Sequence, residues 1–117
     1  MVKDKVYARS TGNIQLLTQQ PRGGRSKNGA LRCGEMERDS MVAQGSSAVL
    51  YDRLYLASDT YEMYICNSCH NPMNGCNYCN NCNTDDLSLI QLPFSCKLLF
   101  QELQAMGIKI NYNPERF

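Results

Sequence analysis

The sequence predicts a small α+β fold organised around two pairs of closely spaced cysteines. The pairs are Cys66-Asn-Ser-Cys69 and Cys79-Asn-Asn-Cys82, and nine residues separate them. Alternating apolar residues before and after the pairs predict two strands, and helical patterns occur on both sides of this region. With 117 residues, the chain is long enough for one domain at most.

The two cysteine pairs have the spacing of a zinc site. Each Cys-x-x-Cys lets the backbone turn so that two thiolates face the same point, and two such turns supply the tetrahedral sulfur set that zinc prefers. The segment from Asn67 to Asn83 contains seven asparagines, a composition typical of turns and poor at forming a core. We therefore expect this segment to fold around one zinc ion. The predicted ligands are Cys66, Cys69, Cys79 and Cys82.

Other ligand sets and other chemistries fit the same spacing. Cys76 forms a further Cys-x-x-Cys with Cys79, and His70 directly follows Cys69, so either can be an alternate ligand. We favour the set without them because it places one pair after each of two predicted strand ends, as a zinc ribbon requires. His70 is then a loop histidine. A disulfide framework is the main rival, and a thiol oxidoreductase would need a reactive thiol of low pKa that crowded zinc ligands do not provide.

Charge and hydropathy limit the partners of this chain. The net charge is only +1, so contact with nucleic acid must come from a local basic patch. No apolar run approaches the ~20 residues that span a bilayer, so no membrane partner is expected. The first residues lack an apolar secretory signal and the cysteine count of seven is odd, which favours an intracellular location. The small apolar content predicts a module stabilised by metal and by a partner surface.

The first part of the chain is predicted to contain short strands and a basic loop. Residues 5–10 alternate well enough for a strand that ends in a turn at residues 11–13. Residues 22–34 contain four basic residues, four glycines and no acid. Glycines allow close approach to another surface, and the cations suit phosphate oxygens, although a solvated flexible loop is the alternative. The candidate contacts are Arg22, Arg25, Lys27 and Arg32.

Two helices are predicted after this loop. The carboxylates of residues 35–39 fall in a first helical turn, where the helix dipole favours negative charge. We interpret them as capping and solvated groups and not as catalysts, because no nucleophile or histidine lies in this stretch. Gly45 is expected to break the helix, and residues 46–47 to cap a second one. In that helix, Leu50 and Leu54 form an apolar stripe that we interpret as core.

The second half is predicted as two strands joined through the cysteine pairs, followed by a last helix. Residues 61–65 alternate as the strand entering the site, and residues 87–90 form its counterpart. Pro93 ends that strand, Gly107 stops the helix, and Cys96 within the helix is a small packed residue. The apolar residues of the helix cover more than one face, so we expect it to dock on another polypeptide. They are Leu98, Leu99, Phe100, Leu103 and Met106.

Four motifs occur in a fixed order along the chain. They are Gly24-Arg-Ser-Lys-Asn-Gly29, Leu31-Arg-Cys-Gly-Glu-Met-Glu-Arg-Asp39, the double Cys-x-x-Cys and Leu98-Leu-Phe-Gln-Glu-Leu103. Together they resemble the carboxy-terminal end of the second-largest subunit of multisubunit DNA-directed RNA polymerases. The resemblance covers residues 5–110, and the Gly-Glu-Met-Glu-Arg-Asp run is its most specific part.

The resemblance implies a role for each motif. The basic loop resembles the switch segment that reaches the template strand and the RNA–DNA hybrid, which implies nucleic-acid contacts by Arg25, Lys27 and Arg32. The four cysteines would hold a structural Zn²⁺ in this subunit's part of the mobile clamp. Mg²⁺ would be bound only in the assembled polymerase, by the largest subunit, so this chain would carry no catalytic residues itself. The implied partners are the largest subunit, the remainder of the second-largest subunit, template DNA and the RNA–DNA hybrid.

The resemblance also divides the chain and limits its origin. Residues 1–34 would end the hybrid-binding region, residues 35–58 would form the anchor-like helices, and residues 59–117 the clamp-like ribbon and last helix. The bacterial form lacks this ribbon, which indicates an archaeal, eukaryotic or viral branch. Asn28, Ala30 and Cys33 depart from the family pattern and suggest a divergent lineage such as a large DNA virus. The location would be the nucleus, or a cytoplasmic viral factory or virion.

A full subunit of this kind is many times longer, so we expect a split-gene product or a fragment of a larger subunit. A different class of function also fits the residues. In that alternative, the chain is a free-standing zinc-ribbon interaction module that holds a protein partner without contacting nucleic acid.

Overall fold

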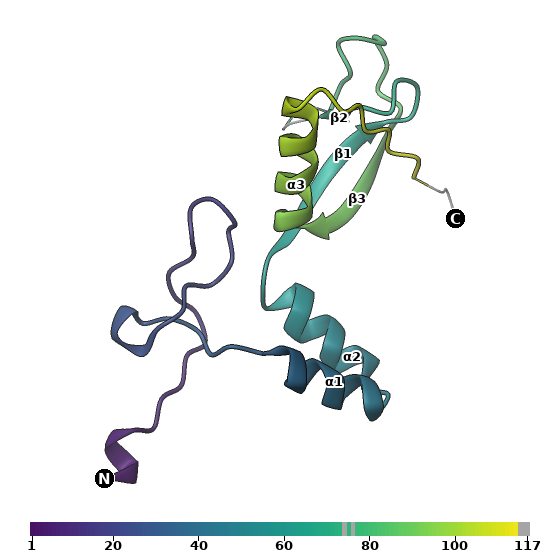
Figure 1. The fold of residues 1–117 in the computed structure, drawn as a ribbon. Coiled ribbons are helices and arrows are strands. Elements are labelled where there is room, and N and C mark those ends of the chain that lie inside the picture. The colour runs from purple at the N-terminus through teal and green to yellow at the C-terminus, as the bar shows by residue number, and fades with distance from the viewer. Residues whose placement is uncertain (74, 76, 115–117) are drawn as a thin grey trace. The chain divides into compact units, whose positions relative to one another are not determined.

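Two units make up the chain in this computed structural model, which describes residues 1–73, 75 and 77–114. The first unit is Met1–Asp59 and the second is Thr60–Phe117 (Figure 1). Both helices and strands occur among the described residues, which confirms the predicted α+β class. No helix there is long and apolar enough to span a bilayer. In chain order, the elements are the 3₁₀ turns η1 (Val2–Asp4) and η2 (Arg25–Lys27), the helices α1 (Glu35–Ala43) and α2 (Ser47–Tyr51), the π-helical segment η3 (Asp52–Leu56), the strands β1 (Thr60–Cys66), β2 (Pro72–Met73) and β3 (Leu87–Pro93), and the helix α3 (Phe94–Ala105).

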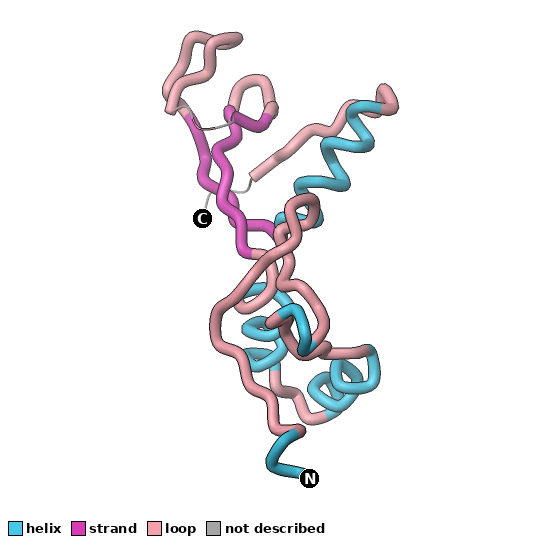
Figure 2. The backbone as a smooth tube through the Cα atoms, turned by 90° about the vertical axis from the view of Figure 1, so that its left-hand side faces the viewer, coloured by secondary structure: helices cyan, strands magenta, loops and turns pink. Residues whose placement is uncertain are grey.

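The predicted strand over residues 5–10 is not formed. The carbonyls of Asp4 and Val6 accept hydrogen bonds from the Arg25 guanidinium, at 2.6 and 3.3 Å, and so are not part of a strand ladder. The described residues before α1 are mostly loop (Figure 2) and pair only through isolated bridges, such as the one between Ile14 and Pro21. Because no described strand pairs with residues 5–10, their alternation has no sheet face to bury.

Helices α1 and α2 confirm the two helices predicted after the basic loop. Gly45 has a φ of 67°, a conformation that glycine adopts at little cost, and the chain turns there as predicted. Ser46 occupies the N-cap position of α2, but its side chain makes no capping hydrogen bond, so that part of the prediction is wrong. The interpretation of Leu54 as core is also wrong, because its side chain is 44% exposed. Two short helices offer too little surface to cover this stripe.

Strands β1 and β3 confirm the two strands predicted on either side of the cysteine pairs. They pair antiparallel over their full lengths, with Tyr61 opposite Leu92 and Met63 opposite Ile90. The short β2 pairs with the other edge of β1, which gives the order β2-β1-β3. Met63 and Ile65 are buried on one face, as the period of two predicts.

Helix α3 lies along this sheet and completes its core (Figure 1). Cys96 and Phe100 of α3 pack against the buried residues Met63, Ile65 and Leu92. Cys96 is thus a packed residue, as predicted. Tyr112, from the segment after α3, packs against the same cluster, and its ring meets that of Phe100 edge to face at 5.6 Å.

Both ends of α3 are defined by specific contacts. Pro93 is the last residue of β3 and the N-cap of the helix. The ammonium of Lys97 lies 4.7 Å from the ring centroid of Tyr61, a cation–π contact that joins the first turns of α3 to β1. At the other end, Gly107 has a φ of 86°, and the N–H groups of Gly107 and Ile108 donate to carbonyls of the last helical turn. This Schellman arrangement confirms Gly107 as the stop.

The core predicts a clear difference between two apolar residues of the sheet. Ile65 is 0% exposed, whereas Leu89 of β3 is 50% exposed. Ile65→Ala is expected to lower the free energy of unfolding by about 2–4 kcal/mol, because it leaves a cavity. Leu89→Ala should lower it by less than about 1 kcal/mol. Urea titration of both variants, with zinc added to each, checks this, and equal losses would show that the core is elsewhere.

Candidate metal centre

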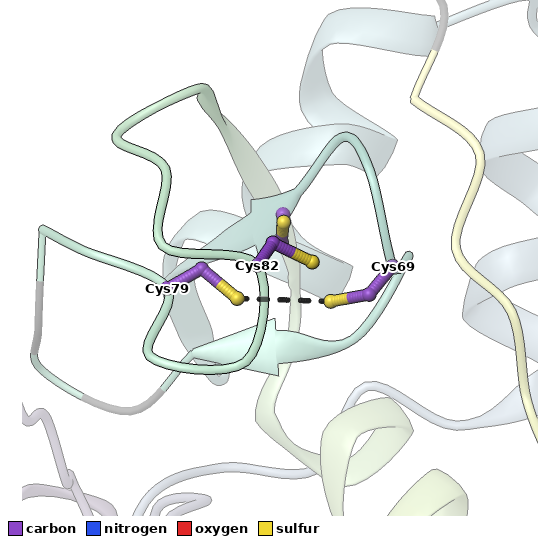
Figure 3. Close-up of side chains that lie close together, drawn as sticks. Cys69, Cys79 and Cys82 are labelled. Carbon is purple, nitrogen blue, oxygen red and sulfur yellow. Dashed lines mark hydrogen bonds between the residues drawn. The ribbon is translucent and has the colours of Figure 1, made fainter.

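Four cysteines come together where the turns of the second unit meet the sheet. Cys66 is the last residue of β1, Cys69 lies in the turn after it, and Cys79 and Cys82 lie between β2 and β3. Their sulfur atoms all lie within 4.8 Å of one another. The Sγ atoms of Cys69 and Cys79 are 3.7 Å apart, and Figure 3 shows the sulfur atoms of its labelled cysteines converging on one space. A tetrahedral zinc with Zn–S bonds of about 2.3 Å has sulfur atoms about 3.8 Å apart, so this spacing fits the ion.

The two cysteine pairs share one backbone arrangement. The N–H of Cys66 donates to the carbonyl of Asn71 at 3.1 Å, and the N–H of Cys79 donates to the carbonyl of Thr84 at 2.9 Å. In each turn, the first cysteine is therefore bonded to the residue five positions later. Because the two turns repeat the same hydrogen bond, each presents its two sulfur atoms in a similar way.

The residue that follows each pair has a left-handed backbone. His70 has a φ of 57° and Asn83 a φ of 53°. This region is disfavoured for most side chains, but asparagine and histidine adopt it more often than other residues. A His or Asn directly after a Cys-x-x-Cys is a sequence signal for such a turn, and it adds to the cysteine spacing described above.

His70, one of the two alternate ligands, is bonded to the segment after α3. Nδ1 of His70 lies 2.9 Å from the carbonyl oxygen of Tyr112, and the His70 carbonyl accepts the N–H of Tyr112 at 3.4 Å. His70 thus ties the first turn to the segment after α3. Among the described residues, the group of metal-ligating side chains that can hold an ion contains cysteines only. Cys76 lies outside the described residues, so its exclusion stays a prediction.

Asn67, inside the first pair, links that turn to the start of β3. Its side-chain N–H donates to the carboxylate of Asp86 at 2.8 Å, and its side-chain oxygen accepts from the hydroxyl of Ser88 at 2.8 Å. Its backbone N–H also donates to the carbonyl of Asp86. The sequence indicates only a turn here, because contacts across about 20 residues have no local signature.

The cysteines differ in their acidity. The backbone N–H of Cys69 stabilises the thiolate of Cys66 and lowers its pKa to about 6. The neighbouring sulfur of Cys69 raises the pKa of Cys82 to about 12, and burial acts in the same direction. Crowded thiols therefore resist joint ionisation. A divalent cation removes this resistance, because it stabilises all of the thiolates at once.

The basic loop lies in the first unit and forms closed backbone turns. Among the described residues, the side chains of Arg22, Lys27 and Arg32 are exposed and make no hydrogen bond or ion pair. Arg25 differs, because its guanidinium donates to backbone carbonyls of the preceding segment. The sequence could not distinguish this arginine from the other cations of the loop.

The antiparallel sheet with its converging cysteines is compatible with a zinc ribbon, the class of site predicted from the sequence. The family model "RNA polymerase Rpb2, domain 7" matches residues 29–115, and "RNA polymerase Rpb2, domain 6" matches residues 1–27. The chain therefore belongs to the family of second-largest RNA polymerase subunits, which confirms the resemblance drawn from its motifs.

Individual relatives agree with the family assignment. The chain is 48% identical over 108 residues to DNA-directed RNA polymerase III subunit rpc2 of Dictyostelium discoideum, which covers 92% of this chain and 7% of that protein. It is 46% identical over 112 residues to the polymerase II subunit RPB2 of Encephalitozoon cuniculi. That match covers 92% of this chain and 10% of the relative. It is 43% identical over 108 residues to the polymerase III subunit RPC2 of Saccharomyces cerevisiae. That match covers 92% of this chain and 9% of the relative. The chain thus spans 7–10% of the length of these relatives.

Serine substitutions test the ligand set. Cys66→Ser and Cys82→Ser are expected to abolish zinc binding and unfold the ribbon, because a structural zinc contributes roughly 10 kcal/mol or more to folding. Cys76→Ser should retain one zinc per chain, and so should His70→Asn, which keeps a residue suited to the left-handed backbone. Elemental analysis of the purified variants decides. Loss of zinc from Cys76→Ser, with zinc kept in Cys79→Ser, would show that the predicted set is wrong.

Zinc affinity should fall as the pH falls. At pH 7 the Cys66 thiol, with a pKa of about 6, is mostly ionised, while Cys82, with a pKa of about 12, must release its proton to bind zinc. Protons therefore compete with the metal, and the dependence should steepen below pH 6, where Cys66 also becomes protonated. Competition titrations with a chelator of known affinity, from about pH 5.5 to about pH 8, measure the zinc affinity at each pH. An affinity independent of pH would exclude thiolate ligands.

Proposed function

We propose that this chain acts as the C-terminal portion of the second-largest subunit of a DNA-directed RNA polymerase. In this role the basic loop contacts template DNA and the RNA–DNA hybrid, and the ribbon forms part of the clamp. The observation that carries the proposal is the order of the family matches, whose junction at residues 27–29 falls inside the basic loop. Nucleotidyl transfer would belong to the assembled enzyme, with Mg²⁺ on the largest subunit and no catalytic residue in this chain.

The proposed division of the chain follows the same order. Residues 1–34 would end the hybrid-binding region, residues 35–58 would form the anchor-like helices, and residues 59–117 the clamp-like part. The site of action would be inside the cell, where the DNA template is. The relatives reported above come from organisms with nuclei, which favours the nucleus over a viral factory.

The proposed cofactor is one structural zinc ion on Cys66, Cys69, Cys79 and Cys82. Four thiolate ligands favour zinc over magnesium or calcium, which prefer oxygen ligands. The sulfur spacing supports a closed, four-coordinate site with no position left for a substrate. The zinc would then fold the ribbon and take no part in the chemistry of transcription.

The proposed nucleic-acid contacts are the exposed cations of the loop. Arg22, Lys27 and Arg32 are free to donate to phosphate oxygens, because no described residue of this chain pairs with them. Phosphate contacts of this kind hold nucleic acid without reading its sequence. Such contacts suit a polymerase, which must hold templates of every sequence.

The proposed protein partner binds the outer face of α3. Phe100 and Cys96 are committed to the core of this chain, so the docking surface is smaller than the sequence indicated. Leu99 of the helix and Met106, the residue at its C-cap, remain 52% and 69% exposed. Lys97 and Gln101 lie on another side of the helix, where they line an open cleft of about 550 Å³, and are not part of this surface. By resemblance, the partner is the largest polymerase subunit, and the remainder of the second-largest subunit would flank it.

Alanine substitutions in the loop test the nucleic-acid contacts. Arg22→Ala, Lys27→Ala and Arg32→Ala should each weaken an assembled polymerase's hold on an RNA–DNA scaffold with little dependence on base sequence. The logarithm of the binding constant falls with the logarithm of the salt concentration. The steepness of this fall should decrease by about one for each variant, because one phosphate contact is lost. Arg53→Ala, outside the loop, is the control. An unchanged complex lifetime and slope in the variant that combines all three substitutions would leave only the solvated-loop interpretation.

Charged substitutions on α3 test the protein contact. Leu99→Asp together with Met106→Asp should prevent assembly with the largest subunit, because both changes place a charge in an apolar interface. Gln101→Asp adds the same charge at an exposed polar position of the helix and should assemble. Copurification from the native source and zinc content are the measurements. Normal assembly of the double variant would favour a free-standing module.

A further inference from the structure

The basic loop is built around a close approach of its own backbone. The N–H of Gly29 donates to the carbonyl of Gly24 at 2.9 Å, and the N–H of Ala30 donates to the carbonyl of Arg22 at 2.6 Å. Gly29 is buried, and a Cβ at this position would overlap the backbone of Arg22 and Gly23. Only glycine fits there, so this closed conformation of the loop requires glycine at position 29.

Tyr7 holds this closed conformation from outside the loop. Its hydroxyl donates to the carbonyl of Gly29, a residue 22 positions later in the chain. The side chain is half-buried, although most residues near it in the sequence are exposed. Tyr7 lies in the part that matches domain 6 and Gly29 in the part that matches domain 7, so this bond joins the two matched regions.

Arg25 holds the loop from within. Its guanidinium donates to the carbonyls of Asp4 and Val6, at 2.6 and 3.3 Å, and lies 5.9 Å from the ring centroid of Tyr7. A guanidinium presents several donors in a fixed planar fork and also contacts aromatic faces, and a lysine cannot reproduce both. The donors of Arg25 are thus directed to the segment before the loop.

We propose that Tyr7 and Arg25 form a latch that positions the basic loop, and that Arg25 is a positioning residue and not a phosphate contact. The inference rests on the proposed nucleic-acid role of the loop. By fixing one loop conformation before binding, the latch reduces the ordering that binding must otherwise impose. Arg22, Lys27 and Arg32 then meet the phosphates as a set.

The test uses the assembled polymerase with Tyr7→Phe or Arg25→Lys, both of which keep every charge of the loop. Hydrogen exchange of residues 22–32, measured without nucleic acid, reports loop closure, and the lifetime on an RNA–DNA scaffold reports binding. Each variant should speed exchange and shorten the lifetime about three- to tenfold, the effect of one lost hydrogen bond. The salt slope should stay unchanged. The double variant should be little worse than the more severe single variant, because both residues act on one structure.

Tyr51→Phe and Arg53→Lys, in the helical part of the same unit, are matched controls and should behave as wild type. A wild-type lifetime in Arg25→Lys, when the alanine variants of the loop shorten the lifetime, would overturn the proposal, because the positive charge of residue 25 would then be enough for binding. Unchanged exchange in Tyr7→Phe would also overturn it. Faster exchange with an unchanged lifetime in all loop variants would uphold the latch and contradict the nucleic-acid role of the loop.

Discussion

The convergence of four sulfur atoms is the constraint on which the second unit depends. Among the described residues, its apolar core cluster has only Met63, Ile65 and Leu92 as buried members, with partly buried residues around them. The turns between β1 and β3 are rich in asparagine and contribute little to that core. Cys66 and Cys79 are themselves completely buried, so the centre of the turn region is sulfur and not hydrocarbon. A metal ion that draws the thiolates together would therefore hold a region that apolar burial cannot hold alone.

The first unit is ordered by a different means. Its described helices contain no buried residues, and its loops are joined by hydrogen bonds from side chains to backbone carbonyls. Such a unit has little hydrophobic stabilisation of its own and exposes apolar side chains such as Met36 and Leu54. These features suit a segment that packs inside a large complex. The second unit exposes Leu99 and Met106 for the same reason, if the chain works as part of a polymerase subunit.

The sequence predicted the elements that have local or periodic signals. The spacing of the cysteines indicated the cluster, and the alternation around Met63 and Ile65 indicated the strand that leads into it. Gly107 was found because a helix stop needs a left-handed residue. The packed face of α3 is harder to predict, since a helix with apolar residues on several sides does not show which side faces the core.

The remaining features depend on contacts between residues far apart in the chain. His70 meets Tyr112 across 42 positions and Tyr7 meets Gly29 across 22, and neither pairing has a sequence pattern. The expected strand over residues 5–10 failed for a related reason, because a strand requires a partner that local alternation does not supply.

Zinc K-edge X-ray absorption on the purified protein tests the metal centre most directly. One zinc per chain with four sulfur neighbours at about 2.3 Å is the predicted result, since all four ligands would be thiolates. A nitrogen neighbour at about 2.0–2.1 Å would instead place a histidine in the ligand set. Such a spectrum, or a protein that folds fully without zinc, would contradict a four-cysteine centre as the basis of this fold.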